Sequence, residues 1–330
     1  MKYLSFLAMF LMLSCTGSTK KEAGEQPQEK IKILIDTDAN NELDDQHALA
    51  YAFLNDDVFD IVGVTVNNTI NGEGIQGHYD EAMRIIRLFN LEDKMPLKKG
   101  AVGMYSEIVP NIDEPDYDGH EAVNFIIDEA KKAGDEKLIL LPVGKLTNIA
   151  LALEKAPEIK DNVKVVWLGA NYPDPGEYNL VNDTTSVNPV IESGVEFEMV
   201  TVRYGKPSGT AAVTVTPDEI KEHVAGKGPV ADEPITGRHG GEFTTFGDYS
   251  VDLFEHINLH GDPPSRALFD MAAVAIVKNP EWAEQKTIPA PKLKGKNWVE
   301  QPNNENKIVI WENFDRDAIV NDFFEKLDKQ

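Results

Sequence analysis

Beyond residue 30, the chain alternates short apolar runs with longer segments whose apolar residues recur at helical spacing. In the first pair, the run Ile31–Ile35 is typical of a buried strand, and Leu43, His47, Ala50, Tyr51 and Leu54 follow the period of a helix. The same pattern predicts strands at Ile61–Val66, Leu138–Leu141, Val163–Leu168, Phe197–Val202 and Lys307–Trp311, and helices at Ile75–Phe89, His120–Ala133, Leu146–Lys155, Arg266–Val277 and Asp315–Leu327. Strands that alternate with helices are typical of parallel βαβ units. We therefore predict an α/β fold with a mainly parallel open sheet and helices on both faces.

The pattern weakens between Val224 and Asp262, where glycines such as Gly237, Gly240 and Gly241 lie among polar and aromatic residues. Surface loops of this kind often carry binding residues on a rigid scaffold. We predict a mobile, poorly patterned excursion that could cover a pocket.

The first residues have the pattern of a secretory signal. A lone Lys2 precedes the apolar run Leu4–Leu13, which is too short to span a bilayer. A small residue, Ser14, then precedes Cys15, the only cysteine of the chain, and this arrangement resembles a bacterial lipobox. The resemblance implies a lipoprotein signal peptide over residues 1–15, with Cys15 lipidated after cleavage. An ordinary signal peptide with an incidental cysteine is the alternative.

Residues 16–30 are polar and lack aromatic side chains, so we expect a disordered tether, with the folded domain spanning residues 31–330. A lipid on Cys15 would anchor the protein in the bacterial cell envelope, outside the cytoplasm, on the periplasmic or the surface side.

Composition limits the partners. With 330 residues and 42% hydrophobic content, the chain can bury a large core, as one large α/β domain or as two smaller ones. The formal charge of −24 argues against nucleic acid, because phosphate backbones are held by fields of Lys and Arg.

Five acidic residues crowd the crossover from the first predicted strand to its helix. They are Asp36, Asp38, Glu42, Asp44 and Asp45. The carboxyl edge of an open parallel sheet is where ligands bind, and a helix N-terminus cannot neutralise so much negative charge. A hard cation such as Ca²⁺ prefers oxygen ligands, whereas Zn²⁺ prefers His or Cys, which this segment barely offers. The alternative is a solvated acidic loop with an Asp N-cap.

Further polar groups follow other predicted strands. They are Asn67 and Asn68, the exposed carbonyls near Val143, and then Asn171, Glu177 and Asn179. Each alone is ordinary turn chemistry. Together at one edge of a sheet, amide and acid side chains suit sugar hydroxyls, so they predict a sugar pocket beside a metal.

These segments resemble the signature of the inosine-uridine-preferring nucleoside hydrolase family. The opening motif, Asp-x-Asp followed by Leu-Asp-Asp at a helix start, here spans Asp36–Asp45. The similarity continues through PVGKLTNIALAL at 142–153, EYN at 177–179, LFDMAAVA at 268–275 and IVIWENFDRDAI at 308–319. The resemblance therefore covers nearly everything from Ile31 to the end, and the ordered set is more specific than any one motif.

The resemblance implies calcium-dependent hydrolysis of the N-glycosidic bond of ribonucleosides, or of a related pentoside, with release of base and ribose. By motif, Ca²⁺ would be bound by the carboxylates of Asp38, Asp45 and Asp270 and by the main-chain oxygen of Val143. Asp38 would also be the base that takes a proton from a calcium-bound water. The sugar would be contacted by Asp44, Glu177 and Asn179, and by Asn171 and Asn67 or Asn68. Family members are often dimers or tetramers, so a homo-oligomer is possible.

Two departures from the family pattern affect the expected site. The connection Ala39–Glu42 is longer than usual by two residues, so the loop must bulge, and Asn40 or Glu42 could enter the site. Phe269 stands where a His commonly precedes the last calcium-binding Asp. Protonation of a purine would then need another donor, and the candidates are His239, His256, His260 and Tyr249. Phe269 could instead stack on a flat leaving group, so the base preference stays open.

Two other functions compete with hydrolysis. An envelope lipoprotein could bind sugars or nucleosides through calcium without cleaving them, although such a binder has no need of a base at Asp38. A phosphatase of the haloacid-dehalogenase type also has Asp-x-Asp after its first strand, but it needs Mg²⁺ and a Lys. Lys145 is the only plausible candidate for that Lys, and the Leu-Asp-Asp fits this class badly.

Overall fold

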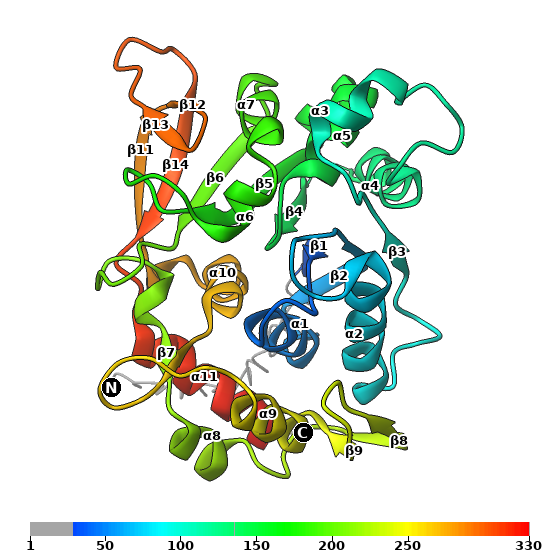
Figure 1. Cartoon of the computed structure of the whole chain (residues 1–330), viewed down its shortest axis with the longest axis vertical. Coiled ribbons are helices and arrows are strands. Elements are labelled where there is room, and N and C mark those ends of the chain that lie inside the picture. Colours follow the sequence, from blue (N-terminus) through cyan, green and yellow to red (C-terminus); the bar gives the residue numbers. More distant parts are fainter. Residues whose placement is uncertain (1–28, 135, 330) are drawn as a thin grey trace, which may run out of the picture.

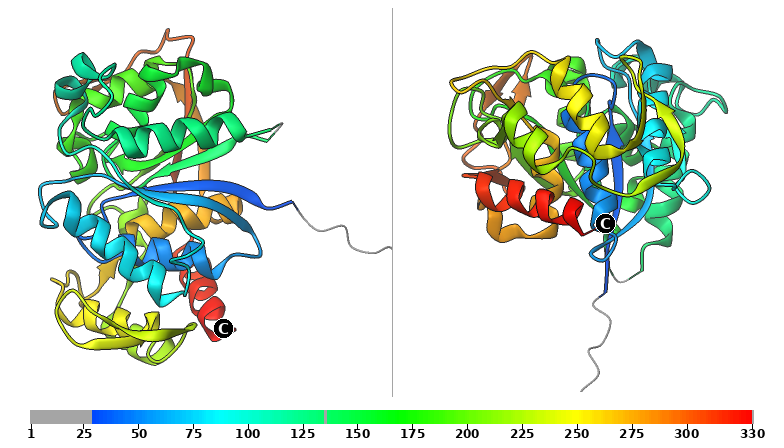
Figure 2. Two further views of the ribbon diagram at one scale, coloured as in Figure 1. Left: turned by 90° about the vertical axis from the view of Figure 1, so that its right-hand side faces the viewer. Right: turned by 90° about the horizontal axis from the view of Figure 1, so that it is seen from below.

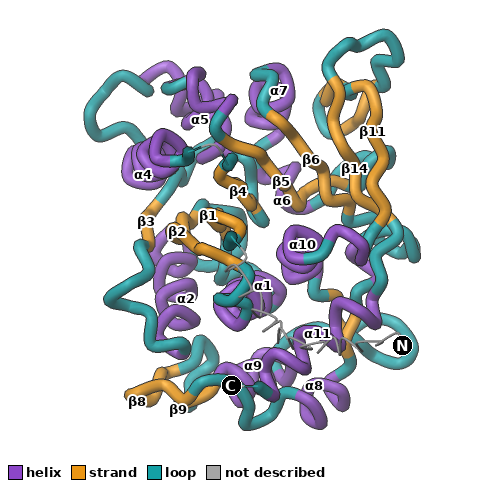
Figure 3. Tube along the Cα trace, turned by 180° about the vertical axis from the view of Figure 1, so that it is seen from behind, coloured by secondary structure: helices purple, strands orange, loops and turns teal. Residues whose placement is uncertain are grey.

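Eight strands form one sheet in the order β11-β14-β6-β5-β4-β1-β2-β3 (Figures 1 and 3). The computed structural model describes residues 29–134 and 136–329. The strands are β1 (Ile31–Thr37), β2 (Phe59–Val66), β3 (Leu97–Lys99), β4 (Leu138–Pro142), β5 (Val163–Ala170), β6 (Glu196–Thr201), β11 (Glu284–Pro289) and β14 (Lys307–Glu312). All neighbours are parallel except β11, which runs antiparallel to β14. The predicted mainly parallel open sheet is confirmed.

Helices cover both faces of this sheet, as predicted (Figure 2). Side chains of a strand alternate between its faces, so Ile33 and Ile35 of β1 pack into one core and Leu34 into the other. The first core contains α1 (Asp44–Leu54), α2 (Gly74–Leu88), α9 (Phe246–Glu255), α10 (Phe269–Lys278) and α11 (Arg316–Asp328). The second contains α4 (His120–Lys132), α5 (Thr147–Lys155) and α7 (Thr184–Glu192).

The described chain also contains shorter helices and strands. They are α3 (Tyr105–Ile108), α6 (Tyr178–Asn182), α8 (Pro217–His223), β7 (Thr214–Val215), β8 (Val230–Thr236), β9 (Glu242–Thr245), β10 (Arg266–Ala267), β12 (Lys292–Lys294) and β13 (Asn297–Val299). Outside the large sheet, β7 pairs with β10, β8 with β9, and β12 with β13.

The order of the strands creates a switch point at β1. The chain runs outward from β1 through β2 to β3 on one side, and it returns to place β4 and β5 on the other side. At such a point the connections after neighbouring strands leave in opposite directions and open a crevice at the carboxyl edge of the sheet.

Helix α1 begins at this crevice and is buried along its whole length. All eleven of its residues are buried, and it packs side by side with α10 (Figure 1). Its polar His47 stays neutral, because burial lowers the pKa of the imidazole to about 4, and both ring nitrogens are satisfied by Leu43 O and Ser250 Oγ. The two helices therefore present their N-termini together from inside the core.

The segment between Val224 and Asp262 corrects a prediction. It is regular structure, with the hairpin β8–β9 followed by α9, rather than a poorly patterned excursion. Phe246, Tyr249, Leu253 and Phe254 of α9 are buried at helical spacing. Most of the glycines that obscured this pattern lie before β8 or in the turn between β8 and β9, and Gly226, Gly228, Gly240 and Gly241 have positive φ.

The helix predicted over Arg266–Val277 also begins later than expected. Arg266 and Ala267 pair with β7, and the backbone of Leu268 is not helical, since its N–H donates to Val213 O. Arg266 is therefore held on a strand, ahead of α10.

The signal peptide, Cys15 and the tether up to residue 28 lie outside the described residues. Within the described part of the chain, no helix is both long and apolar enough to cross a bilayer.

Candidate active site

A cavity of about 230 Å³ opens at the carboxyl edge of the sheet, where α1 and α10 begin. Its acidic side is formed by Asp38, Asp44, Asp45, Glu177 and Asp270. Its lining also includes Glu42, Tyr204, His260, Arg266 and Phe269. The cavity therefore joins a cluster of carboxylates to a mixed aromatic and charged wall.

Four buried carboxylates from three segments meet at the acidic side. Asp38 follows β1, Asp44 and Asp45 occupy the first turn of α1, and Asp270 occupies the first turn of α10. Carboxylate oxygens of Asp44, Asp45 and Asp270 lie within 4.8 Å of one another. The packing of α1 against α10 thus brings together residues more than 200 positions apart, as the motif resemblance implied.

Burial and mutual repulsion make this cluster unfavourable in its ionised form. Burial raises the pKa of Asp44 to about 7 and that of Asp45 to about 8, and neighbouring carboxylates contribute in the same direction. The same two causes hold the pKa values of Asp38 and Asp270 well above their usual range. Among the described residues that line the cavity, Arg266 is the only Lys or Arg, and it pairs with Glu42 instead.

This donor set fits a hard divalent cation. It offers carboxylate oxygens and the Val143 carbonyl, which also lines the cavity, and such all-oxygen sets are the ligands of calcium. The ion itself is not identified by these groups.

Asp36 differs from the clustered acids, although it belongs to the same motif. Its carboxylate accepts hydrogen bonds from Thr65 Oγ1 (2.6 Å), Asn148 Nδ2 (2.7 Å) and Asn67 Nδ2 (3.0 Å), and it does not line the cavity. Burial raises its pKa to about 6, although these hydrogen bonds oppose the shift. Asp36 therefore ties β1 to β2 and α5 beneath the site.

Asn67 stands in this supporting layer and does not line the cavity. Besides its bond to Asp36, its Oδ1 accepts from the N–H of Lys145 at 3.3 Å. Gly144 permits this approach, because a Cβ at that position would lie 2.5 Å from Asn67 Nδ2. The glycine of the Pro-Val-Gly-Lys segment thus lets two strand ends pack closely.

The other residues predicted to contact sugar divide into two groups. Glu177 and Asn179 line the cavity, whereas Asn68 and Asn171 do not. Asn171 Oδ1 instead accepts from the N–H of Tyr204 at 3.2 Å. Lys145, which a phosphatase would need, donates to the carbonyls of Val102 and Gly103 and is not among the cavity residues.

Glu177 and Asn179 are held by the backbone around them. Asn179 Nδ2 donates to Val143 O (2.7 Å) and Leu168 O (3.1 Å), and a carbonyl oxygen has a second lone pair for another partner. Glu177 caps α6 with φ of 138°, a conformation that non-glycine residues adopt mainly at functional sites. Burial raises the pKa of its carboxyl to about 7, and Tyr204 OH donates to it at 3.4 Å.

The rest of the lining contains an aromatic pair and an ion pair. Tyr204 and Phe269 meet edge to face, with ring centroids 5.7 Å apart. Glu42, from the longer loop after β1, pairs with Arg266, whose Nε is buried without a hydrogen-bond partner among the described residues. Asn40 is turned away, since its Nδ2 donates to Gly72 O at 2.9 Å.

Of the candidate proton donors, only His260 lines the cavity. His239 and His256 contact Asp252, and Tyr249 OH donates to Glu81 at 2.6 Å.

Sequence reasoning missed Tyr204, Arg266 and Thr69. Thr69 Oγ1 donates to Asp38 Oδ2 at 2.6 Å and fixes that carboxylate. Tyr204 follows the end of β6, so the criterion that selected Glu177, a polar residue just after a predicted strand, would also have selected Tyr204. Arg266 was not considered as a site residue because the sequence pattern placed it in a predicted helix.

Solved structures share this fold. The purine-preferring ribonucleoside hydrolase from Gardnerella vaginalis superposes with a TM-score of 0.66 at 20% identity, over 90% of this chain and 98% of that chain. The fold is thus that of nucleoside hydrolases. The family model described as inosine-uridine preferring nucleoside hydrolase matches residues 33–321. The chain belongs to this family, as the motifs predicted, and is a hydrolase acting on N-glycosyl compounds.

The chain is also similar in sequence to characterised and uncharacterised proteins. A pyrimidine-specific ribonucleoside hydrolase of Escherichia coli, RihB, is 26% identical over 279 residues, covering 77% of this chain and 80% of that protein. An uncharacterized protein of Schizosaccharomyces pombe is 34% identical over 108 residues, which is 31% of this chain and 34% of that protein.

Proposed function

We propose that the protein cleaves the N-glycosidic bond of ribonucleosides, or of a related pentoside, in a calcium-dependent reaction that releases base and sugar. The observation that carries this proposal is the gathering of Asp38, Asp44, Asp45 and Asp270 at the floor of one cavity, beside Glu177. The family membership supports the reaction class. The relatives differ in the base they are named for, so the base preference is not transferred from them.

Asp38, Asp45, Asp270 and the Val143 carbonyl would hold the calcium ion, and Asp44 would hold a sugar hydroxyl. When bound, the cation would acidify a coordinated water and orient the sugar diol. Calcium is favoured over zinc because the cluster contains no imidazole or thiolate.

Asp38 is proposed as the general base. One of its oxygens accepts from Thr69 Oγ1, which fixes the plane of the carboxylate and leaves the other oxygen to take a proton from the attacking water. Its raised pKa suits a group that must accept a proton during turnover.

Glu177 is proposed to contact the sugar. Cleavage of an N-glycosidic bond passes through an oxocarbenium-like state, in which positive charge develops on the ring. Glu177, oriented by Tyr204 OH and the N–H of Leu180, would stabilise this charge and position a hydroxyl.

A product assay tests the proposal. Free base and ribose are measured over a panel of purine and pyrimidine ribonucleosides, with Ca²⁺ and with EGTA. Calcium-dependent ribose release is expected for at least one of them. Tight calcium-dependent binding without any product would instead favour the non-catalytic sugar-binding lipoprotein.

Arg266 is expected to assist the leaving base, because it is the one Lys or Arg among the described residues around the cavity and its Nε has no partner there. Arg266→Gln should lower nucleoside hydrolysis by about 100-fold. Hydrolysis of p-nitrophenyl riboside should change little, because nitrophenolate departs without assistance. Steady-state kinetics on both substrates check this.

Arg316→Gln is the control, since Arg316 pairs with Glu219 away from the cavity and should leave both rates unchanged. Equal losses on the two substrates in Arg266→Gln would rule out leaving-group assistance.

We also propose that the mature protein is anchored by lipid on Cys15 in the cell envelope. The Ser14-Cys15 sequence after an apolar run supports this. Cys15→Ser should abolish labelling by a radioactive fatty acid and release the protein from the membrane fraction. Labelling that persists in Cys15→Ser would refute the assignment.

A further inference from the structure

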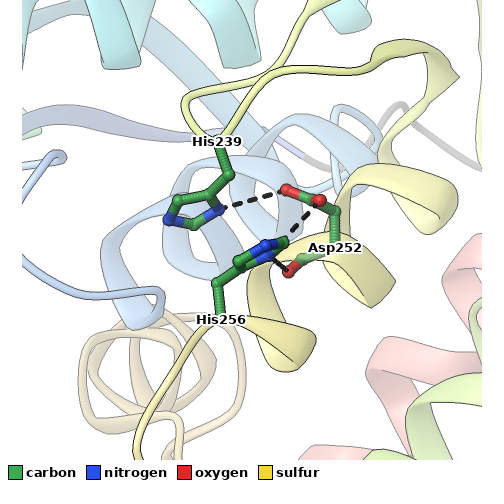
Figure 4. Close-up of side chains that lie close together, drawn as sticks. All are labelled: His239, Asp252 and His256. Carbon is green, nitrogen blue, oxygen red and sulfur yellow. Dashed lines mark hydrogen bonds and ion pairs between the residues drawn. The ribbon is translucent and has the colours of Figure 1, made fainter.

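A second group of metal-ligating side chains lies outside the active-site cavity (Figure 4). Asp252 lies in the last turn of α9, His256 is the C-cap residue directly after that helix ends at Glu255, and His239 comes from the turn between β8 and β9. His239 Nδ1 lies 3.2 Å from Asp252 Oδ2, and His256 Nδ1 lies 3.4 Å from Asp252 Oδ1. Each oxygen of one carboxylate thus faces a different imidazole.

One ligand atom from each of the three residues lies within 4.8 Å of the other two, which is close to the spacing of ligands around one small cation. Zn–N and Zn–O bonds are about 2.0–2.2 Å, so two ligand atoms of a tetrahedral zinc are about 3.4 Å apart. Two imidazoles and one carboxylate are also the donors that zinc and other late first-row metals prefer, in contrast to the all-oxygen cluster at the cavity. We propose that His239, Asp252 and His256 form a second metal site, selective for Zn²⁺ over Ca²⁺.

The two histidines differ in exposure. The side chain of His239 is 26% exposed, and that of His256 is 46% exposed, so the site lies at the surface where a metal ion can reach it.

Binding requires one local rearrangement. The two rings are stacked, with centroids 4.2 Å apart and planes inclined by 24°, and a metal must lie near the plane of each ring it binds. The His256 ring must therefore turn about its Cβ–Cγ bond and release the Asp252 carbonyl, which its Nδ1 now contacts at 2.8 Å. Three protein ligands leave a fourth position for water, so the site would bind reversibly rather than hold a permanent structural ion.

The site is linked to the cavity through its neighbour in sequence. Arg238 donates from Nη1 to the carbonyl of Glu42 at 3.2 Å, and Glu42 lines the cavity and pairs with Arg266. Zinc would fix the turn that carries Arg238 against α9. We expect zinc binding at this site to change KM for the nucleoside more than kcat. This kinetic effect rests on the proposed hydrolysis, whereas the zinc binding itself does not.

The experiment is calorimetric titration of the purified chain with Zn²⁺ in excess Ca²⁺, which keeps zinc from the carboxylate cluster. One zinc site is expected. His239→Gln and His256→Gln should each weaken it by about 10–100-fold or more. His223→Gln is the matched control, because His223 is a partly exposed histidine on α8, outside both sites, and should leave the affinity unchanged.

Co²⁺ in place of zinc provides a second readout that does not depend on activity. Visible absorption typical of tetrahedral cobalt should develop in the parent chain and be absent from Asp252→Asn, with thermal unfolding checking that each variant is folded. Zinc affinity that is unchanged in both His variants, or no zinc binding in excess Ca²⁺, would overturn the proposal. If the protein binds zinc but releases no ribose from any substrate, the metal site is supported and the proposed function is refuted.

Discussion

Asp38→Asn is expected to lower kcat for nucleoside hydrolysis by about 10³-fold or more, because general base catalysis alone contributes about 10²–10⁴-fold. Asparagine has the same shape, and its Oδ1 can still accept from Thr69 Oγ1, so the cavity should keep its form. The amide cannot take a proton from water, and it is a weaker calcium ligand than a carboxylate. Single-turnover kinetics at saturating Ca²⁺ separate the chemical step from the loss of metal affinity.

Asp36→Asn is the informative contrast, because Asp36 is equally buried on the same segment but does not line the cavity. It accepts three side-chain hydrogen bonds, so its replacement should cost about 1–3 kcal/mol of stability. Near-normal turnover in Asp38→Asn, with calcium bound, would assign the base to another group.

Asp270→Asn is expected to change stability in opposite directions with and without calcium. In EGTA the variant should be more stable than the parent by about 1–3 kcal/mol, because it removes one of four mutually repelling buried carboxylates. With Ca²⁺ at about 100 times its dissociation constant, the parent should gain about 2.7 kcal/mol and the variant much less. Chemical unfolding in the two buffers measures both quantities.

The matched control for Asp270→Asn is Asp322→Asn. Asp322 is a partly exposed carboxylate of α11 that pairs with Lys278, outside the cluster, so its replacement should leave the calcium-induced gain unchanged. A parent and an Asp270→Asn variant with the same calcium-induced gain would show that the cluster does not hold the ion.

Six of the eight strands of the sheet were predictable because their signal is local, whereas the edge strands β3 and β11 were not predicted. Ile33, Leu34 and Ile35 form a continuous apolar run, as a strand buried on both faces requires. Helix α9 escaped prediction because glycines crowd the turns on its N-terminal side, and Arg266 was misplaced because its pairing with β7 is a contact between distant segments.

Selecting polar residues just after predicted strands identified part of the site, but it also selected residues that do not face the cavity. Asp38 and Glu177 follow strands and face the cavity, but Asn67 also follows a strand and instead bonds Asp36 beneath it. Position along the chain places a residue at the edge of the sheet, whereas the local backbone decides which way the side chain turns. Asp270 does not follow a predicted strand, so only the resemblance to the family motif placed it beside the other carboxylates.

The complete burial of α1 has a consequence for how such proteins diverge. A helix enclosed on every side cannot shift without disturbing much of the interior, so we expect the acids at its first turn to tolerate little change in position. The wall formed by Glu42, Tyr204, His260 and Arg266 comes instead from connecting segments and a two-residue strand. Changes in substrate choice, by natural drift or by laboratory redesign, should therefore accumulate in those connections while the acidic floor remains unaltered.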